Sequence, residues 1–237
     1  MHIFVLTGAG ISAESGLGTF RDKEGEGIWA KFDPMKLATP EGFASDPVGV
    51  HEFYNARRQN LLAARPNEAH QALARLQQGL TDIGGRLTLV TQNIDDLHEQ
   101  GGCHDVIHMH GELLKARCTA CRHVHPWRDD LGLLDHCPNC GKTGYLRPHV
   151  VWFGEMPLMM DRIYDELSQA DLFVAIGTSG TVYPAAGFVA EARTMSIGTL
   201  EINLEPSEGA RLFDSHLYGP ASSAVPAWVD SVLAGLR

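Results

Sequence analysis

Short apolar runs alternate along the chain with stretches in which apolar residues recur every three or four positions. The strand-like runs cover residues 3–6, 87–90, 106–109, 172–176 and 200–204. Helical patterns start at Pro66, Pro157 and Pro226, and the first of them is expected to stop at Gly79. Because strands alternate with helices, we predict an α/β fold built on a parallel, doubly wound sheet.

Two segments do not follow this alternation. Residues 25–64 lack clear strands and are expected to form a loop followed by inserted helices. Residues 115–145 are poor in apolar periodicity and rich in turn-forming residues. The second segment is too short to have a core of its own, so it is expected to need a metal.

Four cysteines in this second segment supply the ligands for that metal. The spacing is C-x2-C, fifteen residues, then C-x2-C, formed by Cys118, Cys121, Cys137 and Cys140. This spacing is typical of zinc ribbons, whereas a redox pair or a chance pairing would have to explain both motifs. Four thiolates complete a tetrahedral shell and leave no position for water, so we predict one structural zinc ion. Cys103 stands apart and is expected to be a small buried or loop residue.

Composition and charge exclude several classes of protein. The chain has 237 residues, of which 44% are hydrophobic and 20% charged, as in ordinary globular proteins. Its net charge of −10 repels phosphate backbones, so no nucleic-acid partner is expected. No apolar run approaches the roughly 20 residues of a membrane span, and no secretory leader is recognisable. We therefore expect no membrane association and a cytoplasmic location.

The residues that follow each strand carry the functional information, because open parallel sheets bind ligands at the carboxyl ends of their strands. The first strand leads into Gly8, Ala9, Gly10 and Ser12, which fit G-x-G-x-x-A before a helix. Such a turn lets the backbone approach a pyrophosphate, although it can also be a tight turn without a ligand. Dehydrogenases follow it with a second strand ending in an acidic residue, but this chain continues with a glycine-rich loop.

Other strand ends supply polar groups. Asn203 and Glu205 close a later strand and are candidates to bind the ribose, or simply solvated residues at a strand end. His108 and His110 offer proton transfer near neutral pH and share one face of their strand, so periodicity does not choose between them. A single histidine at such a place is more often structural than catalytic, and polar residues in 92–95 could be helix caps.

Taken together, the motifs and their order resemble the sirtuins over essentially the whole chain, and within them the bacterial CobB type. The resemblance is carried by Gly8-Ala9-Gly10-Ile11-Ser12, Thr19-Phe20-Arg21, Gln92-Asn93-Ile94-Asp95, His110-Gly111-Glu112, the four cysteines, Phe153-Gly154-Glu155, Gly177-Thr178-Ser179 and Asn203-Leu204-Glu205.

The resemblance implies a Rossmann-like domain of residues 1–30, 80–114 and 147–237, a cofactor loop and helical insertion at 31–79, and a small zinc domain at 115–146. It implies that NAD is a consumed co-substrate and that acylated lysine side chains of proteins are the partners. The acyl oxygen would attack the ribose carbon that carries nicotinamide, and the products would be free lysine, nicotinamide and O-acyl-ADP-ribose. It leaves the oligomeric state open.

Individual roles are carried over from the family in the same way. His110 would act as general base on a ribose hydroxyl, with Asn93 and Asp95 at the nicotinamide end. The cofactor would contact Gly8, Ala9, Gly10, Ser12, Phe20, Arg21, Gln92, Asn93, Ile94, Asp95, Gly177, Thr178, Ser179, Asn203, Leu204, Glu205 and Ala221. The substrate backbone would pair with the segment that contains Val151, Phe153, Gly154 and Glu155.

Tyr54 and Arg57 lie three positions apart in a helical pattern and therefore on one helix face. Read alone, such a pair is usually an exposed helix face. At this place, however, it resembles the sirtuins that remove succinyl and malonyl groups, because a guanidinium and a phenol can bind a carboxylate.

The sequence leaves rival functions open. They are a plain deacetylase with this pair idle, a protein ADP-ribosyltransferase that uses the same NAD site, and a zinc-ribbon module that only senses a nucleotide. A hydride-transferring dehydrogenase is disfavoured by the missing acidic second strand.

Overall fold

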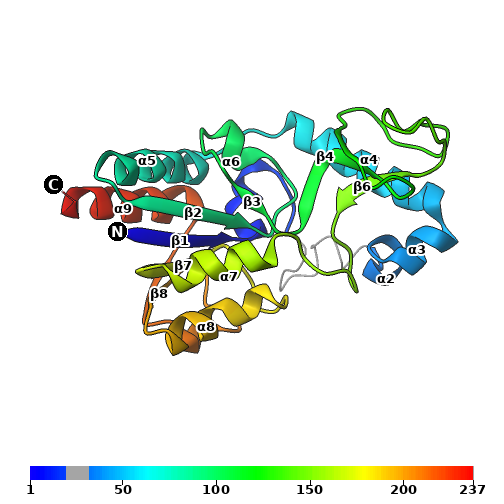
Figure 1. Ribbon diagram of the computed structural model, residues 1–237. Coiled ribbons are helices and arrows are strands. Elements are labelled where there is room, and N and C mark those ends of the chain that lie inside the picture. Colours follow the sequence, from blue (N-terminus) through cyan, green and yellow to red (C-terminus); the bar gives the residue numbers. More distant parts are fainter. Residues whose placement is uncertain (20–31, 237) are drawn as a thin grey trace.

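A six-stranded parallel sheet forms the centre of the computed structural model, which describes residues 1–19 and 32–236 (Figure 1). The order across the sheet is β3-β2-β1-β7-β8-β9. The strands are β1 (His2–Thr7), β2 (Arg86–Thr91), β3 (Ile107–His108), β7 (Leu172–Ile176), β8 (Gly198–Asn203) and β9 (Ser215–Tyr218). This order reverses direction between β1 and β7, which is where doubly wound sheets bind their ligands.

Helices cover both faces of the sheet because apolar side chains alternate along the strands. Ile3 and Val5 of β1 pack on one side with α5 (Glu68–Asp82) and α9 (Ala221–Gly235). Phe4 and Leu6 pack on the other with α7 (Met160–Ser168) and α8 (Phe188–Thr194). The predicted Rossmann-like α/β fold is thus confirmed, and Figure 1 shows the two helical layers on either side of the strands.

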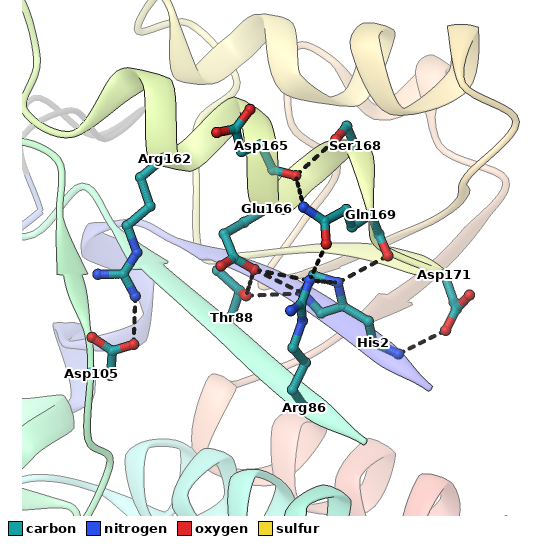
Figure 2. A network of polar contacts seen from close by, with 10 residues as sticks. All are labelled: His2, Arg86, Thr88, Asp105, Arg162, Asp165, Glu166, Ser168, Gln169 and Asp171. Atoms are coloured by element: carbon teal, nitrogen blue, oxygen red, sulfur yellow. Dashed lines mark hydrogen bonds and ion pairs between the residues drawn. The ribbon is translucent and has the colours of Figure 1, made fainter. Parts of the chain in front are cut away.

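A polar network covers the amino-terminal ends of the central strands (Figure 2). The His2 ring lies 2.9 Å from the Thr88 hydroxyl, which donates to Glu166 of α7 at 2.8 Å. The His2 backbone N–H donates to Asp171, just before β7, at 2.7 Å. These bonds join β1, β2, α7 and the start of β7. The protein's own groups therefore occupy the amino-terminal ends of the strands, and the carboxyl ends remain for ligands.

Four helix boundaries differ from the sequence prediction. The helix predicted to start at Pro66 begins at Glu68. The predicted stop at Gly79 is wrong, since α5 continues to Asp82. A Cβ at Gly79 would lie 2.4 Å from a methyl carbon of Leu233, so this glycine lets α9 pack close to α5. The helix predicted to start at Pro157 starts at Met160.

The last helix starts earlier than predicted. It begins at Ala221, and Pro226 lies inside it. The carboxylate of Glu14 accepts hydrogen bonds from the backbone N–H and the hydroxyl of Ser222, at 2.9 and 2.7 Å. Because a distant side chain supplies the acceptor for the first turn, the sequence around the helix does not reveal its start.

A second layer of structure lies beyond the carboxyl edge of the sheet (Figure 1). Inserted helices α2 (Pro34–Leu37), α3 (Pro40–Ser45) and α4 (Pro47–Ala63) follow the first strand, as predicted for this segment. A small antiparallel sheet, ordered β5-β4-β6, consists of β4 (Gly111–Cys118), β5 (Val124–Pro126) and β6 (Leu146–Val150). The short helix α6 (Leu97–Gln100) follows β2. The domain boundaries proposed from the sequence stay predictions, except that α5 packs with the main sheet rather than with the insertion.

Among residues 1–19 and 32–236, none of the helices combines the length and the apolar character that crossing a bilayer requires.

Candidate functional site

A cleft of about 810 Å³ opens at the carboxyl edge of the sheet, between the sheet and the second layer. It is lined by residues that directly follow β1, β2, β7 and β8, together with Tyr54 and Arg57 of α4. A smaller pocket of about 80 Å³ shares Ala9, Arg57 and Asn93 with the cleft and therefore adjoins it.

Most of the predicted site residues meet in these two cavities. The main cleft is lined by the predicted residues Gly8, Ala9, Gly10, Tyr54, Arg57, Gln92, Asn93, Ile94, His110, Val151, Phe153, Gly154, Glu155, Gly177, Thr178, Ser179, Asn203, Leu204, Glu205 and Ala221. Ser12 and Asp95 line the smaller pocket. Phe20 and Arg21 lie outside the described residues. The structure thus brings together segments separated by more than 200 residues of sequence.

The glycine turn after β1 lies directly against the turn after β7. The Gly10 N–H donates to the Gly177 carbonyl at 2.8 Å. A Cβ at Gly8 would lie 2.7 Å from the Gly177 oxygen, and one at Gly10 would lie 2.7 Å from the Gly177 Cα. Gly177 itself has φ of +62°. Side chains are therefore excluded at these three glycines, and the exposed backbone there suits the close approach of a diphosphate.

Geometry separates the two histidines that the sequence could not distinguish. His110 lines the main cleft, and its Nδ1–H donates to the Gln92 carbonyl at 3.0 Å. A carbonyl only accepts, so the proton of the neutral ring sits on Nδ1 and Nε2 keeps its lone pair. Burial lowers the pKa of His110, while the bond to Gln92 opposes that shift. At neutral pH this ring is a base.

His108, by contrast, is buried behind the cleft. Its Nε2 lies 2.7 Å from Glu99 Oε1 of α6. Burial alone would lower the pKa of His108, but the hydrogen bond and charge of Glu99 raise it above its ordinary value. A histidine held in an ion pair cannot readily accept another proton, so His108 has a structural environment and His110 a reactive one.

A buried polar network forms the floor of the smaller pocket. The Ser12 hydroxyl donates to Asp95 Oδ2 at 3.0 Å and accepts from the Asn93 amide at 3.2 Å. The same amide donates to the Gly8 carbonyl at 3.2 Å. Burial raises the pKa of Asp95, opposed by bonds from the Leu97 N–H and Ser12. Each of these side chains is fixed by at least one neighbour, which gives a preorganised polar surface.

Two histidines extend this network into the core. His70 of α5 lies 3.4 Å from the Ser12 hydroxyl, and the His98 ring nitrogen lies 2.9 Å from the Thr7 hydroxyl. Their ring centroids are 5.0 Å apart. Burial lowers the pKa of His70 to about 4 and that of His98 well below its ordinary value. Both rings are therefore neutral in the folded protein.

The far end of the cleft, between β7 and β8, is organised around Thr178. The Asn203 amide donates to the Thr178 carbonyl at 2.9 Å, and the Gln92 amide donates to the Thr178 hydroxyl at 3.1 Å. Asn203 therefore supports the turn after β7 from the neighbouring strand. Leu204 and Glu205, the next two residues, are exposed at the cleft.

Tyr54 and Arg57 share the inner face of α4, as their spacing predicts. Tyr54 is 1% exposed, and its hydroxyl accepts a hydrogen bond from Trp152 Nε1 at 3.0 Å. The Arg57 guanidinium lies 5.9 Å from the centroid of the Tyr54 ring and lines both cavities. Burial raises the pKa of Tyr54, so the phenol keeps its proton at neutral pH.

The segment predicted to pair with a substrate strand follows β6. The N–H groups of Val151, Phe153 and Glu155 already donate to carbonyls within the chain. The Glu155 carboxylate accepts two bonds from Arg147, at 2.7 and 3.0 Å, and one from Arg117 at 3.1 Å. An added strand would therefore have to bond mainly to carbonyl oxygens here, and the Glu155 side chain serves the protein's own structure.

The four predicted metal ligands converge at the end of the small sheet. Their sulfur atoms all lie within 4.8 Å of one another. The Cys118–Cys140 and Cys121–Cys137 sulfur pairs are 3.8 and 3.6 Å apart. A tetrahedral zinc ion about 2.3 Å from each thiolate places its sulfur ligands about 3.8 Å apart. The residues present therefore fit a structural zinc ion, and Cys103 lies apart from them in the main core.

Sequence reasoning missed several residues that shape the cleft. Trp152 lies between two predicted residues, and its side chain points to α4 rather than along the segment. Glu14 and Tyr183 line the cleft from turns whose positions depend on tertiary contacts. The only available signal was the apolar run 150–153, which indicates a buried segment but not its partner.

Comparisons with known proteins agree with this geometry. A model described as the Sir2 family matches residues 8–184. A protein named NAD-dependent protein deacylase from Caulobacter vibrioides is 62% identical over 236 residues, which are 100% of this chain and 98% of that protein. A protein of the same name from Escherichia coli strain K12 is 55% identical, covering 100% and 84% of the two chains. The solved structure of a Sir2 homologue mutant with ADP-ribose superposes with a TM-score of 0.89 at 39% identity, covering 99% of this chain and 93% of that one.

The cysteine geometry predicts a specific loss of metal. Cys140→Ser should reduce the zinc content measured by atomic absorption and lower the thermal midpoint, because the small module has little core of its own. Cys103→Ser, which alters a buried thiol outside the cluster, should keep one zinc per chain. Equal zinc in both variants would contradict the assignment.

Burial of His70 predicts a dependence of stability on pH. The unfolded chain takes up a proton near pH 6.5, whereas folded His70 does so only near pH 4. The free energy of unfolding should therefore fall between these values as pH drops, by about 2 kcal/mol at pH 5 from this residue. Urea unfolding at pH 7.5 and pH 5 should show a smaller pH difference for His70→Gln than for the exposed-site control His104→Gln.

Proposed function

The chain belongs to the Sir2 family and is an NAD-dependent protein-lysine deacylase of the sirtuin type, and we propose that it removes succinyl and malonyl as well as acetyl groups. In this proposal nicotinamide and O-acyl-ADP-ribose are the products. One observation carries the proposal, namely that a phenol and a guanidinium on α4 line the same cleft as a fixed, neutral imidazole. NAD supplies a ribose carbon that becomes electrophilic when nicotinamide leaves.

His110 would take a proton from a ribose hydroxyl. Its Nδ1–H is held by the Gln92 carbonyl, so Nε2 is the atom that accepts the proton. The lowered pKa keeps Nε2 free at neutral pH. The same carbonyl stabilises the ring after it becomes charged, because the Nδ1–H bond persists in both states.

The nicotinamide end would lie in the smaller pocket. Asn93 and Asp95 line it, and Ser12 fixes both of them through hydrogen bonds. Polar groups held in place before binding can orient a planar amide without reorganising. The glycine turns and the residues around Thr178 would hold the rest of the dinucleotide.

An acyl-lysine would enter between the 151–155 segment and α4. A carboxylate at the end of the acyl chain would meet the Arg57 guanidinium and the Tyr54 hydroxyl, which together give charge-assisted hydrogen bonds. The Arg57 guanidinium would be needed to bind a negatively charged acyl end, because the whole chain carries a net charge of −10 and would otherwise repel it. An acetyl group has no charged end and would make neither contact.

Two other functions would use the same site. A plain deacetylase would leave Tyr54 and Arg57 idle, and a protein ADP-ribosyltransferase would pass the ribose to a protein. The Tyr54 phenol and the half-buried Arg57 guanidinium on the cleft wall favour removal of acidic acyl groups over a plain deacetylase. The cytoplasmic location and the lack of nucleic-acid or membrane partners stay predictions from the sequence.

Mass spectrometry of the products tests the reaction directly. The protein, NAD and acetyl- or succinyl-lysine peptides should yield free lysine peptide and the matching O-acyl-ADP-ribose. His110→Ala should abolish both products, because His110 is the one histidine among the described residues that line the cleft. Label from NAD recovered on protein instead would favour ADP-ribosyl transfer.

Arg57→Met tests the acyl specificity. Removing one partner of a buried charge pair costs about 2–5 kcal/mol, so kcat/KM for desuccinylation should fall at least about thirtyfold. Deacetylation should change far less. Arg65→Met, the same change at an exposed arginine just beyond α4, serves as control. Equal losses on the two peptides would count against the pocket.

A further inference from the structure

We propose that Trp152 is a positioning residue for acyl specificity, because its indole N–H holds the Tyr54 hydroxyl so that the phenol proton points toward the acyl carboxylate. This inference rests on the proposed desuccinylase activity and extends it to a residue outside the Tyr54 and Arg57 pair. Trp152 would act through Tyr54 rather than on the reacting atoms.

The direction of the hydrogen bond is fixed by chemistry. The Trp152 Nε1 and Tyr54 hydroxyl oxygen are 3.0 Å apart, and the two side chains are 2% and 1% exposed. An indole N–H can only donate, so the phenol oxygen is the acceptor. The hydrogen of the phenol must then point elsewhere and is available to a second partner.

The indole is itself held from its other side. The Arg147 guanidinium lies 3.3 Å from the centroid of the Trp152 ring. Arg147 donates twice to Glu155, and Glu155 also accepts from the Trp152 backbone N–H at 2.9 Å. Burial alone would raise the pKa of Glu155, but the hydrogen bonds from Arg147 and Trp152 outweigh it and hold this pKa below its usual range. Arg147 and Glu155 therefore stay charged at neutral pH, and their contacts with Trp152 keep the indole from rotating.

These contacts make Tyr54 a donor of defined direction. A phenol without the Trp152 bond could rotate its proton, or could accept a hydrogen bond from Arg57 instead of donating to a ligand. With the indole N–H bound on one side of the oxygen, the phenol hydrogen points away from Trp152 and is set to donate to a ligand. Two donors, the phenol and the guanidinium, then suit one carboxylate, which accepts at two oxygens.

Trp152→Phe removes the N–H and keeps an aromatic face for Arg147. We expect KM for a succinyl peptide to rise roughly tenfold, the size of one lost hydrogen bond to a charged group, with kcat nearly unchanged. Both constants should change far less for an acetyl peptide than for a succinyl peptide, since an acetyl group has no carboxylate to accept the phenol hydrogen. In a Tyr54→Phe background the same change should have no further effect on KM.

Trp127→Phe is the matched control, because the Trp127 indole N–H also donates a hydrogen bond, to the Asp130 carbonyl at 3.3 Å, but away from the cleft. If Trp152→Phe does not fold, Trp152 can be replaced by its benzothiophene analogue, in which sulfur stands in place of the N–H at nearly the same shape. Thermal midpoint and zinc content of each variant establish that the fold is retained.

The outcomes separate this inference from the proposed function. Equal losses on succinyl and acetyl peptides, or no loss on either, would overturn the role of Trp152 while selective losses in Arg57→Met left the pocket intact. Full additivity of Trp152→Phe and Tyr54→Phe would also overturn it. If neither Arg57→Met nor Tyr54→Phe affects desuccinylation selectively, both ideas fail together.

Discussion

The architecture depends on one close contact between two stretches of bare backbone. Gly8 and Gly10 after β1 lie against Gly177 after β7, and a Cβ at any of these positions would meet backbone atoms at 2.7 Å or less. The contact sits where the sheet order reverses, so it brings the two halves of the sheet to a common edge. Asn93 and His110, which follow β2 and β3, line the cleft that opens beside this contact.

Much of this organisation follows from local sequence patterns. The alternation of Ile3 and Val5 with Phe4 and Leu6 predicts a strand buried on both faces, and the structure packs helices on each. The cysteine spacing predicts converging sulfur atoms, since each C-x2-C turn aims two thiolates at one point. Spacing also places Tyr54 and Arg57 on one helix face. In each case residues near in sequence fix the geometry, so no distant information is needed.

The features that the sequence did not reveal depend on residues far apart in the chain. Gly79 looks like a helix stop, but it serves the packing of α9, more than 150 residues later. The choice between His108 and His110 rests on their contacts with Glu99 and with the Gln92 carbonyl. The alternation of residues along the strand does not predict either contact. Strand β9 was not predicted because it has only four residues, all exposed, and its apolar residues Leu217 and Tyr218 are too few to make a strand-like run. Such features are set by tertiary contacts, which periodicity does not encode.

The bond between Glu14 and Ser222 has a consequence for how the molecule holds together. Glu14 lines the cleft, close to the glycine turn, and the residue it binds, Ser222, lies in the first turn of α9, which begins at Ala221. The beginning and the end of the polypeptide are thereby mechanically coupled at the nucleotide cleft. Loosening of the first turn of α9 would release the Glu14 carboxylate at the cleft wall, although only Ala221 of that helix lines the cleft.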